Sequence, residues 1–253
     1  NFREMFANDT RFARSVWVTF FYAALMVPMG QVAALGAAML MAQPLRGINI
    51  FRTIWYLPTV LAGVAMAVMW WWVFDAEQGL VNMLLRPVLD AISGVLNLSE
   101  PLRPPAWFTE DARVAGVPAF AFAGVWGMGG TMLLYLAGLL NIPRDLYEAA
   151  ELDGAGGWAR FRSVTLPMLS PVILFNAVIA IIGSFQVFTL GYVMTKGGPG
   201  DATLFYVLYL YEQAFEHHEM GYASAMAWVL FAIVLALTLI MLRLSRTRVH
   251  YEG

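Results

Sequence analysis

The stretch PRDLYEAAELDGAGGWARFRSVTLPMLSP, residues 143–171, is polar along most of its length and lies between two long runs without charge. Its first half carries helix signals at both ends. Pro143 suits the first helical position, Asp145 favours the positive end of the helix dipole, and Gly154 can adopt the left-handed conformation that ends a helix. These residues predict a short helix over residues 143–153.

One side of this predicted helix is apolar. Three residues at i, i+3, i+4 spacing share that side, and they are Leu146, Ala149 and Ala150. After the glycine-rich residues 154–157, the residues Trp158, Phe161 and Thr165 predict a second short helix. We therefore expect a pair of short helices between two membrane spans, on a surface where a soluble partner can bind.

The composition is that of an integral membrane protein. Of the 253 residues, 60% are hydrophobic and only 13% are charged, and the mean hydropathy is +0.66, far from the usual globular composition. The net charge of −2 comes with scattered basic residues, so no nucleic-acid footprint is present. Because the chain has no cysteine, disulfides, thiolate metal sites and cysteine nucleophiles are excluded.

Several runs are long and apolar enough to cross a hydrocarbon core of about 30 Å. We expect five spans, at about residues 16–41, 53–74, 114–140, 171–194 and 220–242. Residues 75–113 form a long polar segment, expected to be an extracytoplasmic loop with one or two short helices. The apolar stretch 203–211 is too short to cross, and we expect it at the membrane interface.

The positions of the arginines predict the orientation. In this count the loop 43–52, the polar loop 143–170 and the C-terminal tail fall on one side, and each carries arginines. By the positive-inside rule that side is cytoplasmic. We therefore expect the loop 143–170 and the C-terminus inside the cell.

The polar loop contains a set of motif residues at characteristic distances from one another. They are Glu148-Ala149-Ala150, Asp153-Gly154-Ala155, Phe161 and Leu166-Pro167. With this spacing the loop closely resembles the EAA loop, or coupling helix, of the transmembrane subunits of binding-protein-dependent ABC importers. A narrower resemblance, to the sugar and glycerol-phosphate permeases of the maltose-transporter type, rests on Ile142-Pro143, Leu146-Tyr147 and residues 195–199.

The resemblance covers essentially the whole chain and implies an all-α membrane protein with the type I importer permease fold. Five of the family's transmembrane helices are then present, and one further helix is expected ahead of Asn1. The resemblance also implies an inner-membrane complex in a prokaryote, with a second homologous permease, two ATPase subunits and an extracytoplasmic solute-binding protein. ATP and Mg²⁺ are bound by the ATPase subunits, and this chain is expected to carry no cofactor and to be no enzyme itself.

By the same resemblance, the polar loop transmits the movement of the ATPases and drives alternating access. Glu148 is expected to pair with a basic group of the ATPase, Ala149 and Ala150 to allow close approach, and Gly154 to make the turn. The residues expected to couple to the ATPase are Leu146, Glu148, Ala149, Ala150, Asp153 and Gly154.

No catalytic constellation stands out in the sequence. The pair His217-His218, flanked by Glu212, Glu216 and Glu219, is the one metal-like cluster, and a solvated loop explains it better. The glycines of residues 154–157 lack the Gly-Lys-Ser/Thr ending of a phosphate-binding loop. No ionisable residue lies within the five expected spans, which argues against a proton-coupled transporter.

A path for a neutral polyol needs hydrogen-bonding groups and apolar faces. The candidate path residues on the fourth, third and fifth expected spans are Gln186, Phe188 and Thr189, then Trp126, Met128 and Thr131, then Ser224 and Trp228. Gln186 aligns with the region that carries sugar-contacting amides in the maltose permease. The adjacent asparagine pattern of that permease is replaced here by Val187 and Phe188.

The expected cargo is a carbohydrate, either a disaccharide or a short oligosaccharide. A glycerol-phosphate ester is the alternative within the family, but it would favour a basic lining, and the expected spans offer none. Outside the family, two alternative functions stay open. The chain could act as a stand-alone channel or facilitator, or as a membrane-embedded enzyme built on His217-His218.

Overall fold

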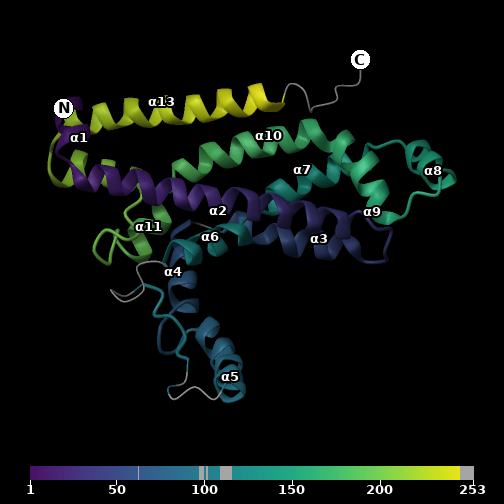
Figure 1. Cartoon of the computed structure of the whole chain (residues 1–253), viewed down its shortest axis with the longest axis horizontal. Coiled ribbons are helices and arrows are strands. Elements are labelled where there is room, and N and C mark those ends of the chain that lie inside the picture. The colour runs from purple at the N-terminus through teal and green to yellow at the C-terminus, as the bar shows by residue number, and fades with distance from the viewer. Residues whose placement is uncertain (62, 97–99, 101, 109–115, 246–253) are drawn as a thin grey trace. The chain divides into compact units, whose positions relative to one another are not determined.

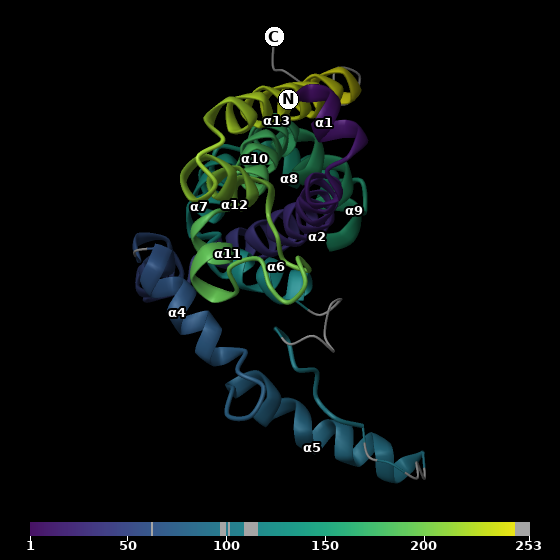
Figure 2. The same ribbon diagram turned by 90° about the vertical axis from the view of Figure 1, so that its left-hand side faces the viewer.

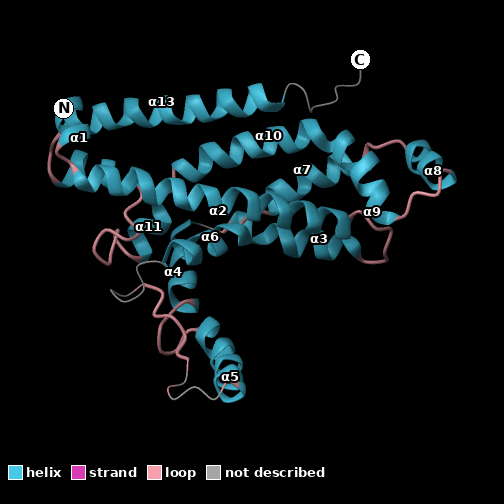
Figure 3. Ribbon diagram, in the orientation of Figure 1, coloured by secondary structure: helices cyan, strands magenta, loops and turns pink. Residues whose placement is uncertain are grey.

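The computed structural model describes residues 1–61, 63–96, 100, 102–108 and 116–245, and these residues form helices and loops without a β-strand (Figure 3). The expected all-α class is therefore confirmed. The chain divides into two compact units. Unit 1 contains residues 1–25, 61–123 and 184–229, and unit 2 contains residues 26–60 and 124–183 and the chain from Leu230 onward.

Among the described residues, three helical segments are long and apolar enough to cross a membrane. They are α2 (Thr10–Met41), the segment Gly157–Met194 and α13 (Met220–Ser245). Two interrupted pairs pass the same test when each pair is taken as one span, which gives up to five spans. The pairs are α3 (Ile48–Tyr56) and η1 (Leu57–Val60) with α4 (Gly63–Val73), and α6 (Gly116–Trp126) with α7 (Gly129–Leu140).

The segment Gly157–Met194 differs from the prediction at its start. It contains α9 (Gly157–Arg160), η3 (Phe161–Thr165), α10 (Leu166–Phe185) and α11 (Thr189–Met194). The prediction of a separate second short helix is wrong, because α9 runs through η3 into α10 without a break. The wide π-helical turn η3 gives room for Pro167, which lacks an N–H and would crowd an ordinary α-helical turn before it.

Residues 203–211, which we expect at the membrane interface, are mostly buried in the core of unit 1. The stretch leads into α12 (Tyr206–Tyr211), and Leu204, Phe205, Tyr206 and Leu208 are at most 1% exposed. The Phe205 ring packs edge-on against two aromatic rings of the same unit, at centroid distances of 5.3 and 5.2 Å. Apolar side chains point in all directions from this stretch, so burial within the protein covers more of them than an interface would.

The core of unit 2 is formed by the second half of α2 packed on α7. Its buried residues are Ala34, Ala37, Ala38, Met41, Met132, Tyr135 and Leu136, and α10 adds the half-buried Val172 and Ile173. The alanines allow the helix backbones to approach closely, as is typical of helix pairs in membranes. Figure 2 shows α2, α7 and α10 in a second view.

The polar segment 75–113 contains α5 (Leu80–Val95), and residues 97–99, 101 and 109–113 of it lie outside the described residues, as do residues 114–115 of the third expected span. Asn82 of α5 is buried and fixes the segment within unit 1. Its Nδ2 donates to the carbonyl oxygens of Ala76 and Pro105, and its Oδ1 accepts from Trp107 Nε1 at 2.7 Å. Polar contacts thus hold this segment where apolar packing is sparse.

Candidate functional site

The predicted helix at the start of the polar loop is α8 (Arg144–Leu152), which lies in unit 2. Pro143 precedes it in an extended conformation, and Asp145 lies in its first turn. Gly154 has a φ of +79°, which favours glycine. This turn lets the Ala155 N–H donate to the Ala150 carbonyl at 2.9 Å, so the expected helix end at Gly154 is confirmed. Pro143 is the N-cap of α8 and not its first helical residue.

Few contacts hold α8 to the rest of unit 2. None of its residues, all of which the structure describes, is buried. The hydroxyl groups of Tyr147 and Thr165 share a hydrogen bond of 3.0 Å, and Arg160 pairs with Glu151 at 3.1 Å. Figure 1 shows α8 beyond α9 at the end of this unit. The helix is therefore held in place at one side and left open on the other.

The open side of α8 exposes large apolar groups. Leu152 is 90% exposed and Leu146 is 40% exposed. Trp158, at the start of α9, is 75% exposed and stacks on the Phe161 ring with centroids 5.3 Å apart. We call the exposed side chains of Leu146, Glu148, Ala149, Leu152 and Trp158 the docking surface. Exposed apolar groups on a short helix are typical of a helix that inserts into a groove of a partner.

Two of these residues were missed as candidates by the sequence reasoning. Leu152 and Trp158 are the most exposed members of the docking surface, yet neither belongs to the motif. The available signal was their position, because each is a large apolar residue next to a polar helix end. Of the predicted coupling residues, Asp153 is exposed at the helix end and Ala150 is half-buried.

The candidate path residues on the third and fourth expected spans lie at helix interruptions. α10 ends at Phe185 and α11 begins at Thr189, so Gln186 and Phe188 lie in the gap. α6 ends at Trp126 and α7 begins at Gly129, with Met128 between them. Broken helices at membrane depth are tolerated where the freed backbone groups are buried in protein or line a polar cavity. The glycines of the third expected span allow either close packing or an opened helix, whereas the sequence did not predict the interruption after Phe185.

The gap after α10 carries an aromatic cluster in unit 1. The Phe188 ring stacks on Tyr192, with centroids 5.3 Å apart and planes 20° apart, and it lies 5.0 Å from the Tyr211 ring. Tyr211 in turn lies 5.1 Å from Phe215. Gln186, two residues before Phe188, is exposed. An amide beside stacked rings combines the hydrogen-bonding and apolar surfaces that a sugar ring needs.

The eight path candidates are spread over both units. Gln186, Phe188, Thr189, Ser224 and Trp228 belong to unit 1, and Trp126, Met128 and Thr131 belong to unit 2. Ser224 and Trp228 lie one turn apart on α13, and both are exposed. Met128 is half-buried against the core of unit 2. The structure thus joins Phe188 to Tyr211, which the sequence did not connect with it.

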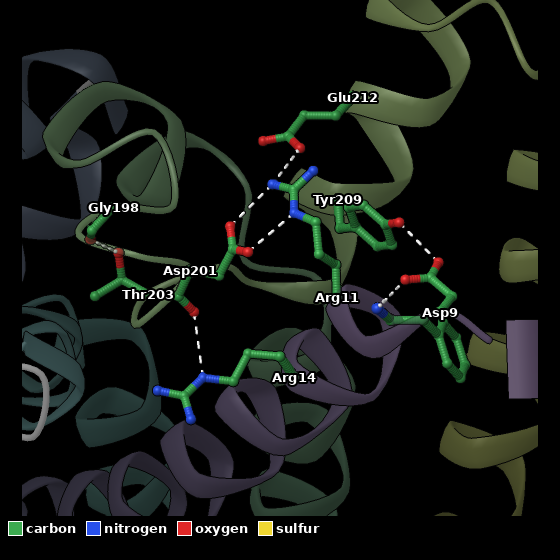
Figure 4. Close-up of polar contacts among 9 residues, drawn as sticks. Asp9, Arg11, Arg14, Gly198, Asp201, Thr203, Tyr209 and Glu212 are labelled. Atoms are coloured by element: carbon green, nitrogen blue, oxygen red, sulfur yellow. Dashed lines mark hydrogen bonds and ion pairs between the residues drawn. The ribbon is translucent and has the colours of Figure 1, made fainter. Parts of the chain in front are cut away.

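A polar network of unit 1 orders the loop that carries the Gly-Gly-Pro motif (Figure 4). Arg11 donates to both carboxylate oxygens of Asp201 at 3.0 and 2.9 Å and to Glu212 at 3.0 Å. Within the loop, the Thr203 hydroxyl donates to the Gly198 carbonyl at 2.6 Å. Because this loop connects α11 with α12, the network helps to position Tyr211.

Asp9 caps the start of α2 in the same unit. Its Oδ1 accepts from the Phe12 N–H at 2.9 Å, and its Oδ2 accepts from the hydroxyls of Tyr209, at 2.7 Å, and Tyr222. Burial raises the pKa of Asp9, but hydrogen bonds from Tyr222, Phe12 and Tyr209 outweigh this effect and leave the pKa below its ordinary value. The carboxylate is therefore charged at neutral pH and is part of the fold.

The metal-like cluster is not assembled in the part of the chain that the structure describes. No group of three or more His, Asp or Glu side chains there is placed to hold a metal ion. His217 and His218 follow η4 (Glu212–Glu216) and are exposed. This geometry gives no support for a catalytic centre at His217-His218.

The helical fold and the long apolar helices are those of a multi-pass membrane protein. Residues 10–250 match the family of binding-protein-dependent transport system inner membrane components, and the chain belongs to this family. It is therefore a permease subunit of an ATP-driven importer, as the resemblance of its polar loop predicts.

Two relatives and one solved structure illustrate the proteins to which this chain is similar. The probable ABC transporter permease protein YesP of Bacillus subtilis is 40% identical over 256 residues, covering 100% of this chain and 78% of the relative. The lactose transport system permease protein LacF of Rhizobium radiobacter is 34% identical over 245 residues, covering 95% and 78%. A bacterial alginate ABC transporter, solved with an alginate pentasaccharide-bound periplasmic protein, has a permease chain of like fold, with a TM-score of 0.76 at 21% identity, covering 95% and 80%.

Proposed function

We propose that this chain forms, with a second homologous permease, the path of an importer for a disaccharide or short oligosaccharide. A solute-binding protein delivers the carbohydrate from outside the cell. Two ATPase subunits bind ATP and Mg²⁺ and contact the permeases from the cytoplasm. The observation that carries this proposal is the docking surface of α8, where Leu152 is 90% exposed and Trp158 is 75% exposed.

In this proposal α8 lies in a groove of an ATPase subunit. Leu152 and Trp158 supply the apolar contact, and Glu148, exposed on the same helix, pairs with a basic group of the ATPase. Ala149 adds little bulk, which allows close approach. Closure of the two ATPases on ATP then moves α8 and shifts the permeases between inward-open and outward-open states.

The cargo is inferred from the path residues and from the relatives. Gln186 and the rings of Phe188, Tyr192 and Tyr211 supply hydrogen bonds and apolar faces for a sugar. A relative of this chain is a lactose permease by its name, which supports a neutral disaccharide. A phosphate ester would favour basic groups along its path, and the five expected spans contain neither lysine nor arginine.

The test is reconstitution of the importer in proteoliposomes. The chain is co-purified with its partner permease, its ATPase and its binding protein, and the uptake of labelled lactose and of labelled glycerol phosphate is compared. We expect saccharide uptake that requires ATP and the binding protein. Uptake of glycerol phosphate instead would support the ester alternative, and uptake by the chain alone would support a facilitator. Either result would contradict the proposal.

A further inference from the structure

Three polar side chains meet in the apolar core of unit 2. Gln31 comes from α2, Tyr135 from α7 and Asn176 from α10, and all three lie within expected membrane spans. Tyr135 is 1% exposed and Asn176 is 3% exposed. Tyr135 lies in the core of unit 2 among alanine, methionine, leucine and isoleucine side chains. Polar groups are costly in such a place, because water cannot replace a missing hydrogen bond there.

The three groups interact through the Tyr135 hydroxyl. This hydroxyl donates to Oε1 of Gln31. The carboxamide of Asn176 faces the same hydroxyl, but its Nδ2 makes no hydrogen bond within the part of the chain that the structure describes. The Tyr135 hydroxyl therefore joins α7 to α2, and the buried amide of α10 lies beside this hydrogen bond.

One side of α10 links this point to the polar loop. Thr165 and Asn176 are eleven positions apart, which is close to three turns, so both lie on the side that also carries Leu169 and Val172. Thr165, Leu169 and Asn176 are at most 5% exposed. Near the start of α10 this side contacts α8 directly, because the hydroxyl groups of Thr165 and Tyr147 share a hydrogen bond.

The same side of α10 packs tightly on α7. A Cβ atom at Gly138 of α7 would lie 2.7 Å from Cδ2 of Leu169 and 3.2 Å from Cγ2 of Val172. A side chain at position 138 would therefore require Leu169 and Val172 to shift. Apolar packing of this kind holds helices together in a membrane but resists sliding weakly, whereas interhelical hydrogen bonds fix the register.

We propose that Gln31, Tyr135 and Asn176 form a polar joint that fixes the register of α2, α7 and α10, so that these helices follow α8 as one body. The helices α7 and α10 enter and leave the polar loop, and a side-chain hydrogen bond ties α2 to α7 at this joint. The role of the joint in transport rests on the proposed function of α8. Its three members are positioning residues, and none of them is assigned to the substrate.

The experiment measures cargo molecules imported per ATP hydrolysed by the complete reconstituted importer. Tyr135→Phe removes the shared hydroxyl, and we expect it to lower this ratio about three- to tenfold, the range for one net hydrogen bond. A triple variant, Gln31→Met with Tyr135→Phe and Asn176→Leu, leaves no buried polar group unpaired and should assemble normally. We expect it to stay uncoupled, because the register is no longer fixed.

The matched control is Tyr206→Phe, which also removes a buried tyrosine hydroxyl, one that donates to the Met226 carbonyl at 2.8 Å in unit 1. It should leave the ratio unchanged. If the triple variant imports as much cargo per ATP as the wild type, the groups are merely structural and the proposal is overturned. The triple variant tests the proposal even if the single variant Tyr135→Phe fails to assemble. A wild-type complex without ATP-dependent import would instead contradict the proposed function itself.

Discussion

The hydroxyl groups of Tyr147 on α8 and Thr165 in η3 share a hydrogen bond of 3.0 Å, across eighteen positions of sequence. Thr165 is buried, whereas α8 has no buried residue of its own. This contact therefore fixes α8 to the start of α10 at its one sheltered point. In the proposed function of α8, this contact passes a movement of α8 to the membrane helices.

We predict that Tyr147→Phe weakens the coupling of ATP hydrolysis to import. The loss of one hydrogen bond, about 1 kcal/mol, lets α8 move without Thr165. Binding-protein-stimulated ATPase activity should fall severalfold, while the amount of complex stays the same. The matched control is Ser163→Ala, whose hydroxyl donates to Ala159 within its own helix at 2.8 Å. An equal effect of both substitutions would argue against a special role for Tyr147.

Leu152→Asp should prevent stable binding of the ATPase. A charge replaces a leucine that is 90% exposed, so folding of the permease should be unaffected, while an apolar contact in the partner groove is lost. Co-purification of the ATPase with the tagged permease measures the effect. Leu84→Asp on α5 changes a leucine that is 73% exposed, away from the docking surface. The ATPase should remain bound to that variant.

Glu148→Lys should abolish ATPase activity that depends on the binding protein. Glu148 is exposed on α8, and a lysine there would face the basic group expected on the ATPase, so attraction becomes repulsion. Insertion into the membrane should be unchanged. Glu216→Lys, at an exposed position of η4, serves as the control. Undiminished import by the Glu148 variant would contradict the pairing.

Asp9→Ala should destabilise the protein at neutral pH by about 1–2 kcal/mol, the usual value for an N-cap. Hydrogen bonds hold the pKa of Asp9 below its ordinary value, so its charged form stabilises the fold above the pKa of the unfolded chain, about 3.9. This stabilisation is lost as the pH falls through the lower pKa of the folded state. Thermal unfolding of the detergent-solubilised protein should therefore show a difference in Tm that is full at pH 7 and shrinks below about pH 4. A difference independent of pH would exclude the charge as its cause.

The parts of the structure that the sequence predicted depend on local signals. Pro143, Asp145 and Gly154 act within one helix, so α8 could be placed from its own residues. The long charge-free runs likewise predicted apolar helices, since crossing a membrane requires length and apolarity alone.

The features that the sequence missed depend on contacts between distant segments. Arg11 and Asp201 are 190 positions apart, and nothing near either residue indicates its partner. Residues 203–211 were assigned by length to the interface, but buried rings of unit 1 surround Phe205. The interruption at Gln186 contains no glycine or proline, so Val187 and Phe188 looked like continuing apolar helix.

Site-directed crosslinking tests the central claim most directly. The chain has no cysteine, so Leu152→Cys introduces a single thiol on the docking surface, and Leu84→Cys places one on α5 as a control. In the purified importer we predict that a short thiol crosslinker joins position 152 to the ATPase subunit and leaves position 84 unjoined to it. If position 152 forms no crosslink with the ATPase, or reacts with an impermeant thiol reagent added outside intact cells, then α8 is not the contact through which ATP hydrolysis drives this permease.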